Sequence, residues 1–200
     1  MLKIYQLHQE EDTSKLDATY VPMHEPTASF WEMAQEIRKE NHYAWGLFDD
    51  EVTSRTGIKG NEFTSFINDN PQADVWFMGP HYEVEINQWV KADTSYPGIS
   101  KIPNLLFQLA GNDIDVTKIS GLPTCNRNYF VGNEKFWNLY FEVIDNMIEV
   151  CQSNADLNHV MFEEDVELKT PYFLHVLENM FPTIIRLSPE INSAGLMYKP

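Results

Sequence analysis

Three acids follow directly after an apolar stretch in the sequence GLFDDEV, residues 46–52. Asp49, Asp50 and Glu51 come at the end of the run 43–48, which has the composition of a strand buried on both faces. Open α/β sheets bind ligands at the carboxyl ends of their strands. Mg²⁺ and Mn²⁺ prefer one or two carboxylates together with phosphate oxygens of a substrate. We therefore predict a Mn²⁺ or Mg²⁺ site on these three acids; the alternative is a solvated loop or a helix cap.

A second candidate site is the polar stretch in the sequence CNRNYFVG, residues 125–132. The side chains of Asn126 and Asn128 both donate and accept hydrogen bonds, which suits the hydroxyls of a sugar. The guanidinium of Arg127 suits a phosphate or a carboxylate. We predict that these three residues bind substrate, and the alternative is that the two asparagines only shape a turn.

An acidic run further along the chain offers a candidate catalytic base or a second metal ligand. Its carboxylates belong to Glu163, Glu164, Asp165 and Glu167. Most such runs are solvated surface, which is the competing interpretation. Within the run we take Glu164 as the candidate catalytic residue.

Aromatic residues near the end of the apolar segment 73–78 could form a wall on which a sugar stacks. The wall would consist of Trp76, Tyr82 and Trp89, and His81 is a further binding candidate beside it. Core packing is the competing interpretation for Trp76, and a structural hydrogen bond is the competing one for His81. The sequence contains no GxSxG, GxGxxG or P-loop motif, so the common dinucleotide and NTPase sites are not indicated.

The charge of the chain restricts its partners. The 200 residues include 14 basic and 30 acidic side chains, which gives a formal net charge of −16. Such a charge repels nucleic acid and anionic membranes, so neither is an expected partner. It also disfavours a phosphate ligand unless a cation lies between, which is a second reason to predict a metal. The sequence shows neither a secretory signal nor an apolar run near the roughly 18 residues of a membrane span, so we expect a cytoplasmic protein.

Apolar periodicity predicts strands that alternate with helices. We predict strands at 3–7, 18–23, 43–48, 73–78 and 129–131, and helices from Ser29, at 61–69, at 100–111, at 133–151 and from Thr170-Pro171. Residues 81–99 alternate in part and could form an edge strand, whereas 151–171 is polar and turn-like. This order predicts one α/β domain, 1–200, with a mostly parallel or mixed central sheet flanked by helices.

Three segments together resemble glycosyltransferase-like proteins of bacterial capsule and lipopolysaccharide loci. They are HYAWGLFDDEVTSRTGIKGNEFTSFINDNPQADVWFMGP (42–80), CNRNYFVGNEKFWNLYFEVIDNMIE (125–149) and PYFLHVLENMFPTII (171–185). The resemblance lies in the order and type of elements rather than in a diagnostic motif. It implies a GT-A-like fold and transfer of a sugar from a nucleotide-diphosphate donor to a glycan acceptor.

The same resemblance implies roles for the candidate residues. The carboxylates at 49–51 would hold a divalent cation on the diphosphate, with Arg127 assisting, and the asparagines beside Arg127 would bind sugar hydroxyls. Glu178, in the closing helix, or Glu164 would orient the acceptor, and an inverting enzyme would need one such carboxylate as general base. Two alternatives stay open: an inactive, acidic interaction module of the same fold, and a metal-dependent phosphoester hydrolase.

Overall fold

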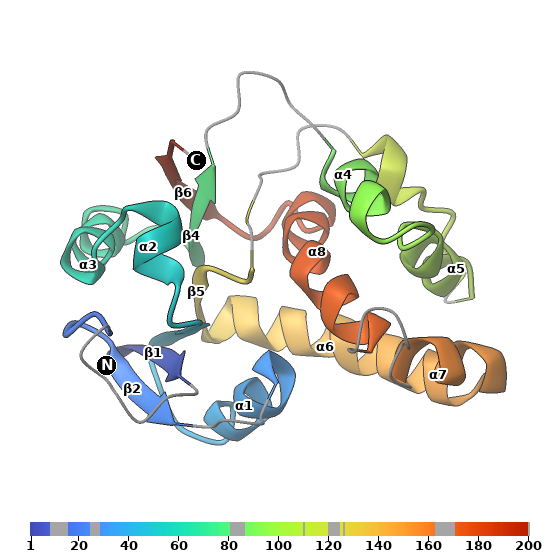
Figure 1. Ribbon diagram of the computed structural model, residues 1–200, viewed down its shortest axis with the longest axis horizontal. Coiled ribbons are helices and arrows are strands. Elements are labelled where there is room, and N and C mark those ends of the chain that lie inside the picture. The colour runs from blue at the N-terminus through green and yellow to red at the C-terminus, as the bar shows by residue number, and fades with distance from the viewer. Residues whose placement is uncertain are drawn as a thin grey trace. The chain divides into compact units, whose positions relative to one another are not determined.

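A mixed six-stranded sheet organises the first of two compact units in this computed structural model (Figure 1). The sheet unit comprises Met1–His81, Cys125–Trp137 and Pro189–Pro200, and the helical unit comprises Tyr82–Thr124 and Asn138–Ser188. The structure describes residues 1–8, 16–24, 29–80, 87–109, 111–119, 125, 127–162 and 171–199. The expected single domain 1–200 stays a prediction.

The strand order in the sheet is β2-β1-β3-β5-β4-β6. All strands run parallel except β5, which is antiparallel to both of its neighbours, so the sheet is mixed, as expected. Four of the five predicted strands overlap the observed ones closely, the second begins three residues later than expected, and the last strand of the chain was not predicted. The bounds are β1 Leu2–His8, β2 Val21–His24, β3 Ala44–Phe48, β4 Val75–Pro80, β5 Phe130–Asn133 and β6 Ser193–Tyr198.

The middle of the sheet is buried on both faces. Every residue of β3 and β4 is buried, which explains why their sequences are continuously apolar rather than alternating. Gly46 in β3 is required by close packing, because a Cβ there would lie 2.5 Å from the main-chain oxygen of Phe130 in β5. The indole of Trp137 stacks on that of Trp45 with the ring centroids 3.8 Å apart, and its N–H donates to the main-chain oxygen of Trp45. The glycine allows β5 to lie close to β3, and the indole stack holds Trp137 against β3.

Among the described residues, three helices lie wholly within the sheet unit, and two of them were predicted. The helix expected from Ser29 is present and begins with a capping box formed by Ser29 and Glu32. The helix expected at 61–69 is also present. The short helix after the acids was not predicted. The bounds are α1 Phe30–Ile37, α2 Val52–Thr56 and α3 Gly60–Asp69.

The helical unit corrects two expectations. Residues 88–95 form a helix rather than part of an edge strand, because Asn87 caps the main-chain N–H groups of Trp89 and Val90. The segment expected to be turn-like contains a helix at 155–162, whose first turn is capped by Asn154. Residues 81–86 and 163–170 lie outside the described residues. The bounds are α4 Gln88–Ser95, α5 Lys101–Leu109, η2 Val116–Lys118, α6 Glu134–Gln152, α7 Ala155–Phe162 and α8 Tyr172–Leu187. The first residues of α6 belong to the sheet unit.

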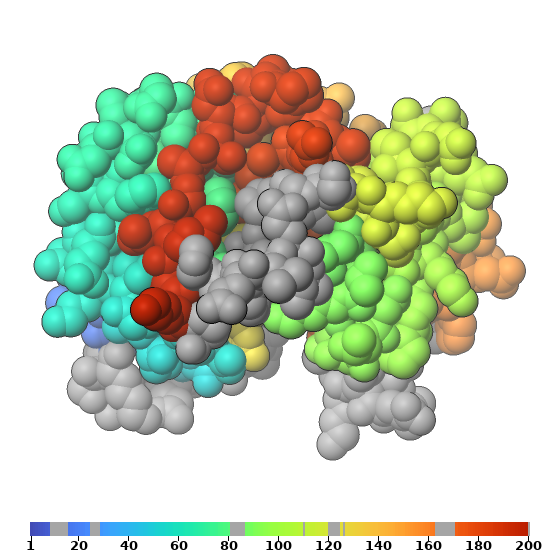
Figure 2. Space-filling model, turned by 90° about the horizontal axis from the view of Figure 1, so that it is seen from above, coloured from blue at the N-terminus to red at the C-terminus, as the bar shows by residue number. Residues whose placement is uncertain are grey.

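Strand β6 closes one edge of the sheet beside β4. Most of its residues are at least partly exposed, and its end, dark red in Figure 2, lies at the surface of the face shown there. Met197 in β6 is 48% exposed. Among the helices of the described ranges, none combines the length and the hydropathy that a bilayer crossing requires.

Candidate functional site

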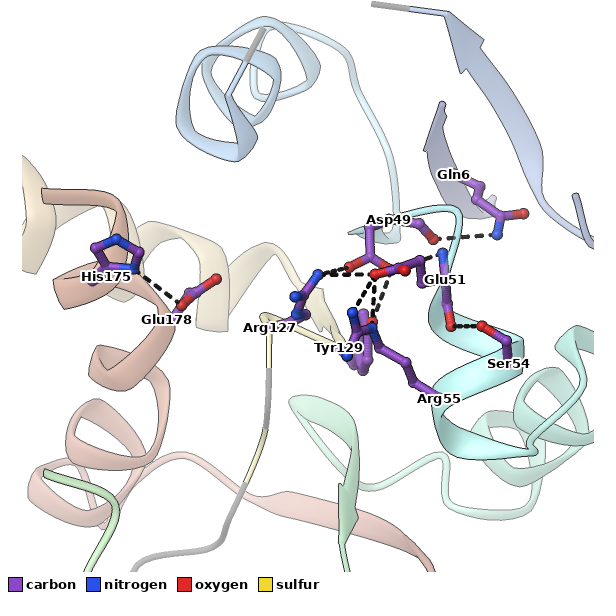
Figure 3. A network of polar contacts seen from close by, with 9 residues as sticks. All are labelled: Gln6, Asp49, Glu51, Ser54, Arg55, Arg127, Tyr129, His175 and Glu178. Atoms are coloured by element: carbon purple, nitrogen blue, oxygen red, sulfur yellow. Dashed lines mark hydrogen bonds and ion pairs between the residues drawn. The ribbon is translucent and has the colours of Figure 1, made fainter. Parts of the chain in front are cut away.

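The predicted acids lie at the carboxyl edge of the parallel strands. Asp49 follows the last residue of β3, and the side-chain amide of Gln6 in β1 donates to its main-chain oxygen at 3.2 Å. The hydroxyl of Tyr129, the residue before β5, donates to the Asp49 carboxylate at 2.8 Å (Figure 3). Because β5 is antiparallel, its beginning lies where β3 ends. Three strands therefore contribute to one polar cluster at the edge where open α/β sheets bind ligands.

Arg127 occupies the space between two of the acids. Its Nη1 lies 3.3 Å from Oδ2 of Asp49 and 3.2 Å from Oε2 of Glu51. Arg55, one helical turn after Glu51, also binds Oε2 of Glu51, with its Nε at 2.8 Å. Two guanidinium groups therefore face two carboxylates (Figure 3). This arrangement offsets two of the three negative charges that the sequence GLFDDEV places here.

Burial and charge act in opposite directions on this cluster. Burial raises the pKa of the Asp49 carboxyl, although the hydrogen bonds from Tyr129 and Arg127 oppose the shift. The hydrogen bond from Arg55 lowers the pKa of Glu51, which is half exposed. Burial, followed by the charge of Asp49, raises the pKa of the Tyr129 hydroxyl. Asp49, with its side chain 30% exposed, is thus the more buried of the two carboxylates that the guanidinium groups face, and its charge depends on the donors around it.

The acids do not present a ready oxygen cage for Mn²⁺ or Mg²⁺. Arg127 lies where a cation shared by Asp49 and Glu51 would lie, and Asp50 is exposed. Within the described ranges, no group of three or more His, Cys, Asp or Glu side chains is arranged to hold a metal ion. The arrangement as it stands fits a guanidinium better than a divalent cation. The predicted metal site stays a prediction, and no chemical step below depends on it.

The backbone of the loop that carries Arg127 is strained. Arg127 and Asn128 have φ angles of 51° and 60°, and two successive non-glycine residues rarely adopt this left-handed region. Asn128 is only 5% exposed, and its side-chain Oδ1 has no hydrogen-bond partner among the described residues. An unpaired buried acceptor costs about 1–3 kcal/mol. A strained turn with an unpaired amide oxygen is the kind of position where a ligand donor would be stabilising.

Other predicted binding residues lie elsewhere or outside the described part. Trp76 is an internal residue of β4, is 1% exposed, and donates its indole N–H to the main-chain oxygen of Asn70 at 2.9 Å. A sugar cannot stack on this ring without opening the core of the sheet unit. Trp89 is fully buried in the helical unit, where it donates to Thr183. The remaining candidates of this kind lie outside the described residues: His81, Tyr82 and Asn126.

The two predicted catalytic acids stay predictions. Glu178 lies in α8 of the helical unit with its side chain 38% exposed, and its carboxylate is 3.7 Å from Nδ1 of His175 (Figure 3). Glu164 lies outside the described residues.

The sequence did not single out three members of the cluster. Gln6 and Tyr129 looked like ordinary strand residues, and only the pairing of their strands with β3 brings them to Asp49. Arg55 could have been found, because a Glu and an Arg four residues apart on a helix form an ion pair. Its helix was not predicted, so the signal was missed.

The fold and this polar edge define the class of protein: an α/β protein whose mixed sheet, flanked by helices, gathers polar side chains at one carboxyl edge. A solved structure described as the apo form of WbbM, a bifunctional glycosyltransferase, matches this chain with a TM-score of 0.60 at 13% identity. The match covers 99% of this chain and 45% of that one, so this chain spans less than half of that protein's length. At this identity the likeness shows the fold alone. No family model matches the sequence, and no curated protein matches it significantly.

Proposed function

We propose that this protein is a glycosyltransferase that transfers a sugar from a nucleotide-diphosphate donor, in the assembly of a bacterial surface glycan. The fold-level likeness to a glycosyltransferase supports the class of activity. The observation that carries the site is Arg127, which is held between Asp49 and Glu51 at the carboxyl edge of the sheet by a strained turn.

Arg127 would bind the diphosphate. Its side chain is 45% exposed, and only Nη1 is engaged by the acids, so Nε and Nη2 have no hydrogen-bond partner in the part of the chain that the structure describes. A guanidinium binds phosphate oxygens through two parallel N–H groups. Asp49 and Glu51 would act as positioning residues that hold this cation in place. A local cation is needed because the chain as a whole has a net charge of −16.

Asn128 would bind a sugar hydroxyl. Its buried Oδ1 accepts no hydrogen bond from the residues that the structure describes, and a hydroxyl donor from the ligand would pair it. In the transfer, the bond from the anomeric carbon to the diphosphate oxygen breaks and the acceptor hydroxyl oxygen forms the new bond. The acceptor proton passes to a carboxylate base, for which Glu178 and Glu164 remain the proposed residues. The diphosphate leaves with the negative charge that Arg127 stabilises.

Thermal unfolding with UDP, other nucleoside diphosphates and their sugars tests this proposal. At a ligand concentration of one hundred times Kd, mass action adds about 2.7 kcal/mol. For a chain of this length that corresponds to a rise in Tm of roughly 5–10 °C. Each ligand is measured with Mn²⁺ and with EDTA, which also tests the predicted metal. Sugar transfer to glycan acceptors and release of free phosphate are then followed by mass spectrometry.

Arg127→Gln is the decisive variant, with Lys39→Gln as the matched control. Both remove one positive charge from the sheet unit, and among the described residues the side chain of Lys39 pairs with Glu36 in an exposed ion pair. We expect the shift to disappear in Arg127→Gln and to remain in Lys39→Gln. A shift that survives Arg127→Gln would place the site elsewhere. No shift of the wild type with any nucleoside diphosphate would support the inactive interaction module, and phosphate release without transfer would support the hydrolase.

A further inference from the structure

Two histidines meet at the ends of the first two strands. The parallel pairing of β1 and β2 places His8 directly opposite His24, and each is the last residue of its strand. Their Nδ1 atoms are 3.4 Å apart, and the ring centroids are 4.9 Å apart with the planes tilted by 45°. His8 is 6% exposed, whereas His24 is open to solvent. One ring is therefore fixed by packing, and the other is accessible.

The spacing of the two nitrogens matches the edge of a tetrahedral zinc site. Zn–N distances of about 2.0–2.1 Å and a tetrahedral angle separate two nitrogen ligands by about 3.4 Å. We infer that His8 and His24 bind a divalent transition metal ion, Zn²⁺ in the first instance, each through Nδ1. Imidazole nitrogens select Zn²⁺, Cu²⁺ or Ni²⁺ over the oxygen-binding Mg²⁺ and Mn²⁺. This site is therefore chemically distinct from the carboxylate site predicted from the sequence, and it does not depend on the proposed function.

The two nitrogens are already spaced as two ligands of one ion are. Without metal, a proton on one Nδ1 is shared with the lone pair of the other. The metal ion would take the place of that proton, because the distance between the two nitrogens is that between two nitrogen ligands of one zinc ion. Within the described ranges no third His, Cys, Asp or Glu completes a cluster with them. The two imidazoles therefore supply two of the ligands of a tetrahedral zinc ion.

The site belongs to the same edge of the sheet as Asp49. His8 lies two residues after Gln6 in β1, so both side chains are on one face of the sheet. Gln6 in turn donates to the main-chain oxygen of Asp49. Both histidines end parallel strands, as the residue before Asp49 does. The metal would be bound at the carboxyl edge, where ligands of open sheets gather.

Calorimetric titration of the full chain with Zn²⁺, after removal of trace metal with EDTA, tests the inference. We expect one Zn²⁺ per chain, with affinity reduced at least tenfold in His24→Gln and unchanged in the control His159→Gln. His159 is exposed in α7, in the helical unit. Titration with Mg²⁺ should give no heat from this site. Equal affinity of wild type and His24→Gln, or no Zn²⁺ binding by the wild type, would overturn the inference.

A second measurement does not depend on a variant. Imidazole ¹⁵N resonances report which ring nitrogen binds the ion, so Zn²⁺ should move the Nδ1 resonances of His8 and His24 far more than their Nε2 resonances. Shifts confined to other histidines would contradict the assignment, even if the overall affinity were as expected. Replacement of Zn²⁺ by Co²⁺ then reports the geometry, and an octahedral spectrum would contradict the tetrahedral site.

Discussion

The hydroxyl of Tyr129 lies 2.8 Å from Oδ1 of Asp49, and this hydrogen bond joins the beginning of β5 to the end of β3. It forms because β5 is antiparallel in a sheet whose other strands are parallel. The loop before β5 therefore reaches the carboxyl edge and brings Arg127 with it. The proposed site depends on this reversal of one strand more than on any local sequence pattern.

Removal of the Tyr129 hydroxyl should destabilise the protein. Tyr129→Phe leaves the enclosed Asp49 carboxylate without one of its donors, and we expect the free energy of unfolding to fall by about 1–3 kcal/mol. Tyr43→Phe is the matched control, because Tyr43 is 63% exposed and the same atom is removed. Urea unfolding at neutral pH measures both variants. Equal effects of the two substitutions would show that the hydrogen bond to Asp49 contributes nothing.

The loss in Tyr129→Phe should depend on pH. Because burial raises the pKa of Asp49 in the folded state, stability is lost progressively as the pH rises from the unfolded-state pKa through the folded-state pKa of this carboxyl. Loss of the Tyr129 donor raises the pKa further, so the difference between variant and wild type should be largest at neutral pH. It should shrink as the pH falls and Asp49 becomes protonated. A difference that is constant from neutral to acid pH would contradict this account.

Much of the fold was predictable because its signals are local. The capping box at Ser29 and the wide apolar face of α6 predicted helices that the structure confirms. The continuous apolar runs of β3 and β4 predicted strands covered on both faces. The α4 helix was missed because its short sequence alternates in part, and the decisive signal was the cap at Asn87. The helix propensity of the residues is a weak guide to secondary structure when a single capping side chain stabilises the helix.

The candidate site was less predictable because strand pairing creates it. The sequence identified Asp49, Glu51 and Arg127, and the structure brings these three together. It could not show that Arg127 would lie between the acids, since the two segments are 76 or more residues apart. The facing pair of His8 and His24 has no sequence motif either. Register between parallel strands depends on long-range packing, which a local pattern does not contain.

The stacked indoles of Trp45 and Trp137 should carry a large share of the stability of the sheet unit. Trp137 is 3% exposed, its ring lies parallel to that of Trp45 within 5°, and its N–H is hydrogen bonded. We expect Trp137→Ala to cost about 3–5 kcal/mol and Trp137→Phe to cost less. Trp31→Phe, at a partly exposed position of α1, is the control.

Circular dichroism gives an independent test of this stack. Two indoles with centroids 3.8 Å apart produce an exciton couplet in the far ultraviolet when their transition dipoles are rotated relative to one another within the stacked planes. A couplet due to this stack should disappear in Trp137→Phe and in Trp45→Phe, and it should persist in Trp31→Phe. Survival of the wild-type couplet in either of the first two variants would show that it does not come from this stack.

At two glycine positions, the asparagine variant should differ in stability from the alanine variant in opposite directions. A Cβ at Gly46 would meet the main-chain oxygen of Phe130 at 2.5 Å, so Gly46→Ala should cost about 1–3 kcal/mol by overpacking. Gly57 has a φ of 70° with nothing within 4 Å of its Cβ position, so Gly57→Ala should cost roughly 1–2 kcal/mol through backbone strain alone. Asparagine tolerates that backbone region but is larger than alanine. Urea unfolding should therefore show Gly57→Asn to be more stable than Gly57→Ala. At position 46 it should show Gly46→Asn to be less stable than Gly46→Ala. The reverse order would contradict backbone strain as the cause at position 57, or overpacking as the cause at position 46.

Buried tyrosines should make the protein lose stability at alkaline pH. Burial, together with the charge of Glu40, raises the pKa of Tyr5 to about 12, and burial also raises the pKa values of Tyr20 and Tyr129. The unfolded chain ionises its tyrosines near pH 10. Folded-state stability due to these hydroxyls is therefore fully present below pH 10 and is lost as the pH rises toward 12. Phenolate absorbance should show at least three of the 9 tyrosines ionising late in the native chain and all of them together in urea. The contrary result would be that every tyrosine ionises near pH 10 while the circular dichroism remains native. The hydroxyls described as buried would then be accessible to water, which would contradict the hydrogen bond between Tyr129 and Asp49.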